Sequence, residues 1–68
     1  MNVFGLQIRE EREKQLLSVE MLGFKSGLGG ETIEQIEEGV LHPNVAQLFK
    51  ISASLGKQPG HFFTKLVR

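Results

Sequence analysis

The sequence contains no cysteine, which excludes both a disulfide framework and a metal site built on thiolates. Its two histidines, His42 and His61, are far apart in the chain and lack a nearby aspartate, so no metal ion or other cofactor is expected. No apolar run approaches the roughly 18 residues that a helix needs to cross a bilayer. The first residues also lack the basic start and long apolar segment of a signal peptide. We therefore expect a cytoplasmic protein with no membrane partner.

The chain has no excess of either charge, because its eight basic residues are matched by eight acidic ones. A protein dedicated to nucleic acid usually carries a basic excess or a basic face, since neutralising phosphates supplies much of the affinity. The total charge therefore counts against nucleic-acid binding. An uneven distribution of these charges can still create a local basic patch, so this class of function stays open.

An enzyme is disfavoured because the sequence offers no believable set of catalytic side chains. Cysteine is absent, and no serine is placed near a histidine in a usable arrangement. The glutamates are expected on helix surfaces rather than around a pocket. We expect no catalytic residue and no enzymatic activity.

The apolar spacing predicts one all-α domain of five helices, since 68 residues leave no room for a second core. The first helix is predicted from Val3 to about Gln15. Ser18 is a suitable N-cap for the second, which is expected to end at Gly27. Gly29 and the residue after it begin the third.

The second half of the chain contains signals for the remaining helix ends. Gly39 is expected to close the third helix, and Asn44 to cap the fourth. The fourth helix is predicted to bury a stripe at spacings of three and four, made of Val45, Leu48, Ile51, Ser52 and Leu55. A last short helix is expected to start at Pro59.

Taken together, these signals resemble the lambda-repressor-like, or Xre, helix-turn-helix family over about Phe4 to Phe63. The residues that carry the resemblance are Phe4, Gly5, Ile8, Arg9, Arg12, Leu17, Ser18, Leu22, Gly27, Leu28, Ile33, Ile36, Glu37, Glu38, Gly39, Pro43, Leu48, Ile51 and Leu55. The resemblance implies a compact five-helix DNA-binding domain over residues 1–68, with the helix-turn-helix at about 18–37. It also implies that Arg12 pairs with Glu37, which would fasten the first helix to the third.

The resemblance assigns DNA contacts to four positions of the third helix, namely Gly30, Glu31, Thr32 and Gln35. An amide such as Gln35 can bond adenine in a bidentate way, and Thr32 can contact a thymine methyl group. Glu31 can accept a hydrogen bond from cytosine, although the phosphates repel its charge. Phosphate contacts are expected from three further residues, Lys25, His42 and Asn44.

The chain departs from the family pattern around these positions. Val19 stands where a phosphate-contacting glutamine is common, and Gly23 where alanine is usual. The third helix carries several glutamates, and no lysine or arginine lies between Lys25 and Lys50.

Two functions follow from this combination. The first is a sequence-specific DNA-binding transcriptional regulator of prokaryotic or phage origin, acting as a homodimer on a palindromic operator. The alternative is a degenerate helix-turn-helix module that acts mainly on a protein partner, like an antitoxin or a repressor antagonist. At least one of the two adjacent phenylalanines should close the core, and the expected dimer contact consists of Phe62, Phe63 and Leu66.

Overall fold

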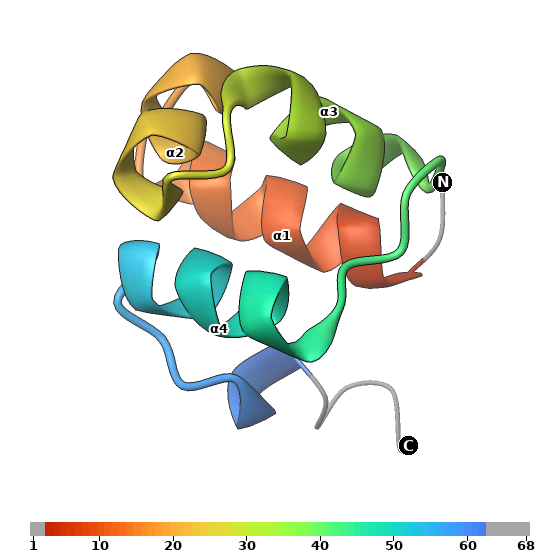
Figure 1. Ribbon diagram of the computed structural model, residues 1–68. Helices are drawn as coiled ribbons and strands as arrows, with labels where there is room; N and C mark the ends of the chain where they lie inside the picture. The colour runs from red at the N-terminus through yellow and green to blue at the C-terminus, as the bar shows by residue number, and fades with distance from the viewer. Residues whose placement is uncertain (1–2, 63–68) are drawn as a thin grey trace.

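The computed structural model describes residues 3–62, which form helices joined by short turns (Figure 1). The four full helices are α1 Val3–Lys14, α2 Val19–Ser26, α3 Gly30–Glu38 and α4 Val45–Ser54. A further helical segment begins at residue 60 and reaches the last described residue. No strand occurs between residues 3 and 62, which confirms the predicted all-α, five-helix architecture. Within the same range, no helix is both long enough and apolar enough to cross a membrane.

The ends of α2, α3 and α4 follow from the chemistry of single residues. Ser18 caps α2, because its Oγ accepts a hydrogen bond of 3.0 Å from the N–H three residues on. Asn44 Oδ1 accepts from the Gln47 N–H at 2.7 Å, and Gln47 Oε1 accepts from the Asn44 N–H at 3.0 Å. This reciprocal pair is a capping box. Gly27 and Gly39 end α2 and α3 with left-handed backbone, and these ends agree with the predicted ones.

α1 ends at Lys14, one residue before the predicted end, and the left-handed residue that follows is not a glycine. The Leu17 N–H donates to the Arg12 carbonyl at 3.1 Å, and the Leu16 N–H donates to the Glu13 carbonyl at 3.0 Å. These are the two hydrogen bonds of a Schellman motif, which requires a left-handed residue and usually employs glycine. Here Leu16 takes that place with a φ of 60°. Its side chain is 88% exposed, so burial does not offset a strain of about 1–2 kcal/mol.

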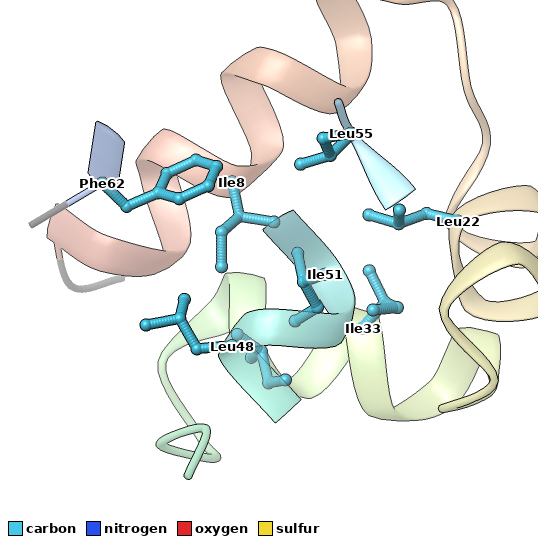
Figure 2. Close-up of a cluster of buried hydrophobic side chains, with 8 residues drawn as sticks. Ile8, Leu22, Ile33, Leu48, Ile51, Leu55 and Phe62 are labelled. Atoms are coloured by element: carbon cyan, nitrogen blue, oxygen red, sulfur yellow. The ribbon is translucent and has the colours of Figure 1, made fainter. Parts of the chain in front are cut away.

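One cluster of buried apolar side chains joins all the helices (Figure 2). Its members are Ile8, Leu22, Ile33, Ile36, Leu48, Ile51, Leu55 and Phe62. The predicted stripe of α4 is therefore buried from Leu48 onward, together with Ser52. Val45 is the exception, since its side chain is 66% exposed. It is the first residue of α4, one turn before the stripe meets the core, and its predicted burial was wrong.

Phe62 closes the core at the end of the described chain. Its side chain has no exposed surface, and its ring meets that of Phe4 edge-on, with the centroids 6.4 Å apart. This corrects the expectation that Phe62 contacts a second copy, because a fully buried side chain has no surface to offer. Phe63 and Leu66, the other two residues of that expected contact, lie outside the described residues.

Candidate nucleic-acid interface

The two helices of the helix-turn-helix touch backbone to backbone. Gly23 of α2 lies against Gly29 and Gly30, and a Cβ added at Gly23 would collide with the backbone of both. The Gly29 N–H donates to the Gly23 carbonyl at 3.1 Å, so the turn is also hydrogen-bonded to the helix. Glycine therefore permits a closer approach of α2 and α3 than an alanine would allow here.

The start of α3 depends on two more glycines. Gly29 has a φ of 90° and a ψ of 147°, a backbone conformation that is essentially restricted to glycine. It caps α3 without a side-chain hydrogen bond. A Cβ at Gly30 would lie 3.2 Å from the Glu20 Cα, so the first turn of α3 sits close against the start of α2. At this position α3 therefore lacks a side-chain cap and packs closely against α2.

The solvent-facing side of α3 is acidic. Glu31, Glu34 and Glu38 are exposed, whereas the opposite side buries its apolar residues in the core. Thr32 and Gln35 are partly exposed, three residues apart, and therefore neighbours on the helix surface. Gln35 also lies four residues after Glu31 and three before Glu38. The side chain best suited to read a base is therefore flanked by two carboxylates.

The first turns of α3 and α4 each present free backbone N–H groups. Within residues 3–62, the N–H groups of Glu31 and Thr32 make no hydrogen bond, and the same holds for Val45 and Ala46 after the capping box of α4. Such groups at a helix N-terminus can bind a phosphate without any basic side chain. These groups belong to the backbone and therefore do not depend on the acidic side chains of α3.

The three residues expected to contact phosphates are not brought together. Asn44 caps the N-terminal end of α4, and His42 is exposed in the loop just before it. Lys25 instead lines a groove with Leu55 and Gly56, at the C-terminal end of α4. The ten residues of α4 separate these ends by about 15 Å. Lys25 therefore belongs to a different part of the surface.

Arg12 and Glu37 are joined by a bidentate contact behind α3. Arg12 Nε donates to Glu37 Oε2 at 2.7 Å, and Arg12 Nη2 donates to Glu37 Oε1 at 3.0 Å. Both residues are less than 9% exposed. Arg12 Nη1 also donates to the Leu17 carbonyl at 2.7 Å, just before the cap of α2. The hydrogen bond with Glu37 raises the pKa of Arg12, against the opposing effect of burial. One guanidinium thus holds α1, α2 and α3 in register.

Close backbone contact supports this arrangement between α1 and α3. A Cβ added at Gly5 would collide with the carbonyl oxygens of Ile36 and Glu37. Gly5 therefore lets α1 lie directly on the C-terminal half of α3. The rear of the candidate DNA-reading helix is held by a buried ion pair at one point and by backbone contact at another.

Glu11 is a second buried carboxylate, and the sequence analysis assigned it no role. Gln15 Nε2 donates to Glu11 Oε2 at 3.0 Å and to the Leu55 carbonyl at 2.7 Å. Lys57 Nζ and His61 Nε2 lie 3.8 and 4.0 Å from the same carboxylate. The hydrogen bond from Gln15 lowers the pKa of Glu11; burial opposes this shift, and the nearby positive charges reinforce it. The spacing of four between Glu11 and Gln15 was the one signal in the sequence.

Comparison with known proteins gives one match. A family model described as helix-turn-helix matches residues 8–62, a range that includes α2, α3 and α4 and most of α1. No curated protein and no solved structure shows significant similarity to this chain. Among residues 3–62, no group of three or more histidine, aspartate, glutamate or cysteine side chains comes together as a metal site would require.

Proposed function

The chain belongs to the lambda-repressor-like helix-turn-helix family, and we propose that it is a sequence-specific DNA-binding regulator of transcription. The observation that carries the proposal is the family match over residues 8–62. The packing of α2 on α3 through Gly23 supports it, because a helix-turn-helix must present its second helix as part of a rigid pair.

In this proposal α3 enters the major groove and two side chains read bases. Gln35 bonds adenine through its amide, and Thr32 contacts a thymine methyl group. Glu31 accepts a hydrogen bond from the amino group of a cytosine, so we expect a cytosine at that position of the preferred site. Gly30 supplies no side chain for reading bases, and a Cβ there would face the start of α2.

The phosphates on the two sides of the groove would be held mainly by backbone groups. The free N–H groups of Val45 and Ala46 at the start of α4 bind one phosphate, with Asn44 and His42 beside them. The free N–H groups at the start of α3 bind another. Lys25 is left out because it lies at the opposite end of α4. Few ionic contacts predict a shallower dependence of affinity on salt than basic family members show.

A symmetric dimer would place two copies of α3 about 34 Å apart, one turn of DNA. Since Phe62 is part of the core, we assign the dimer contact to the outer face of α4. Val45 and Phe49 lie four residues apart there and are 66% and 54% exposed. Phe49→Glu is expected to leave the fold intact and to give a monomer in sedimentation experiments. An unchanged dimer would remove this surface from the proposal.

Selection of bound sequences from a random duplex library at low salt tests the proposal. We expect an enriched palindrome, and we expect Gln35→Ala to relax the preference at one base of each half-site, at a cost of about 1–3 kcal/mol. Glu10→Ala, on the exposed side of α1, is the matched control and should change nothing. A library that shows no enrichment would contradict the proposal.

One observation favours the alternative, a module that acts on a protein partner. The exposed face of α3 carries Glu31, Glu34 and Glu38, and such a face would suit the basic surface of another DNA-binding protein. Changing all three to glutamine separates the two functions. For a DNA-binding regulator, removing the repulsion tightens duplex binding. For an antagonist, the variant still binds no duplex.

A further inference from the structure

An open groove lies where the ends of three helices meet, away from the exposed face of α3. Its volume is about 590 Å³. The residues that line it are Gln15, Lys25, Ser26, Lys50, Ala53, Ser54, Leu55 and Gly56. In Figure 1 the end of α2, in yellow, faces the end of α4, in cyan, on one side of the molecule. Because the groove is open rather than enclosed, it can hold a segment of polypeptide that passes across it.

Two lysines line the groove and give it a positive charge. Among residues 3–62, neither Lys25 nor Lys50 forms an ion pair. Lys25 lies in the last turn of α2, where it complements the helix dipole. Lys50 does not complement a helix dipole in this way, because it lies before the last turn of α4. Two unpaired ammonium groups on one groove favour a ligand that carries carboxylates.

Large exposed apolar side chains occur next to lining residues in the sequence, and we call them the apolar border of the groove. Leu16 directly follows Gln15, which forms one wall, and Phe24 directly precedes Lys25, which forms another. Their side chains are 88% and 85% exposed. Met21 is 52% exposed and lies one helical turn before both Phe24 and Lys25, so it links the two along the surface of α2.

Leu16 adds an independent reason to see a binding surface here. The left-handed position at the end of α1 favours glycine, so a leucine lowers the stability of the folded chain. Because the side chain is exposed, it contributes almost nothing to the core in return. Strain that folding does not explain is commonly found where a residue contacts a ligand.

We propose that this groove and its apolar border bind an acidic segment of a partner protein. The carboxylates of the segment would lie against Lys25 and Lys50, and its large apolar side chains against Leu16, Met21 and Phe24. The proposal goes beyond DNA binding, because the groove is formed by the ends of α1, α2 and α4 and leaves the exposed face of α3 free.

Two other occupants fit the charges or the apolar surface less well. The last residues of this chain carry Lys65 and Arg68, which would be repelled by the two lysines of the groove. The α3 helix of a second copy has the right charge, but its large apolar side chains, Ile33 and Ile36, are buried. It would leave Leu16 and Phe24 uncovered. An acidic segment with apolar side chains satisfies both features.

Selecting phage-displayed random peptides of about 12 residues on the immobilised full chain tests the proposal. We expect the enriched peptides to be acidic and to carry leucine or phenylalanine. The affinity of one such synthetic peptide is then measured by fluorescence anisotropy. The double variant Lys25→Glu/Lys50→Glu should weaken it about tenfold or more. Lys14→Glu, at an exposed position outside the groove, is the control and should change it less than about twofold.

Two further variants test the apolar half of the site. Phe24→Ser should weaken the same peptide about tenfold. Leu16→Gly should weaken it while raising the midpoint of thermal unfolding, so the loss cannot come from a damaged fold. Unchanged affinity in both variants would overturn the proposal.

The other outcomes of the selection are equally decisive. Failure to enrich any peptide, enrichment of neutral or basic peptides, or affinity that ignores both lysines would overturn the proposal. Self-association of the chain in sedimentation experiments that Lys25→Glu/Lys50→Glu abolishes would assign the groove to a second copy instead. No step involves DNA, so failure here leaves the proposed DNA-reading role of α3 standing, and failure to select a duplex leaves the docking site standing.

Discussion

Two regions of the molecule differ in how well their residues are paired. One is the contact between α1 and α3, and the other is the open end, where the groove lies between the ends of α2 and α4. Between α1 and α3, the buried Arg12 is paired with the carboxylate of Glu37, and Gly5 has no side chain that would keep the two backbones apart. At the open end, two lysines have no ion pair among residues 3–62 and a strained leucine is exposed. The first region is explained by folding. The second requires a reason outside the folded monomer.

Arg12→Ala should break the first region most severely. It removes both hydrogen bonds to the buried Glu37 and leaves only Arg9, 3.8 Å away, and removing one member of a buried ion pair costs about 3–5 kcal/mol. Denaturant unfolding of purified protein measures this loss. Lys14→Ala is the matched control, because Lys14 is an exposed cation of the same helix and should cost about 0–1 kcal/mol. If both variants lose the same small amount, Arg12 contributes no more than a surface charge.

Gly5→Ala should disturb the same region through packing alone. The new methyl group would meet two carbonyl oxygens of α3, and overpacking of this kind costs about 1–3 kcal/mol. Gly60→Ala provides the comparison, since a Cβ there meets nothing within 4 Å. Thermal unfolding of the two variants gives the difference. Equal stability would show that α1 can withdraw from α3 at no cost.

Leu16→Gly, at the open end, should stabilise the protein. Glycine adopts the left-handed conformation without strain, so we expect a gain of about 1 kcal/mol in the free energy of unfolding. Leu16→Ala removes the same exposed side chain but keeps the strain, and it should therefore give no comparable gain. A glycine variant no more stable than the alanine variant would remove the argument from strain.

Glu11→Gln should give the smallest effect, and one that depends on pH. The pKa of Glu11 is lowered from its ordinary value of 4.5, so its ionised form stabilises the folded state. That contribution is complete above the unfolded pKa and disappears as the pH falls through the lower folded pKa. The stability difference between wild type and variant should therefore shrink from pH 6 towards acid, about pH 3. Glu10→Gln, at an exposed position, should show no such change.

Most of the scaffold could be predicted because it depends on local chemistry. Ser18 and Asn44 cap helices through their own side chains, and Gly27 and Gly39 end helices through their own backbone conformation. Periodic apolar spacing likewise located the buried stripe of α4 from Leu48 onward. In each case the deciding interaction spans at most one or two helical turns.

The errors and omissions concern residues whose surroundings come from distant parts of the chain. Val45 has the right spacing for burial, but within residues 3–62 its side chain is 66% exposed. Glu11 is buried, and its partner Gln15 also bonds the Leu55 carbonyl, forty residues away. The sequence does not say which of two adjacent phenylalanines reaches the core, and the contact that places Phe62 there is with Phe4, near the other end of the chain. Periodicity carries no information about such contacts.

The position of Arg12 has a consequence for the entropy of recognition. Its guanidinium joins Glu37 of α3 to the Leu17 carbonyl at the entrance of α2, so both helices are ordered before any ligand arrives. The loss of conformational freedom is then part of folding and is absent from the free energy of binding. This preorganisation matters most for an acidic helix such as α3. The free energy of its few contacts with a ligand does not also have to offset the entropy of ordering the protein.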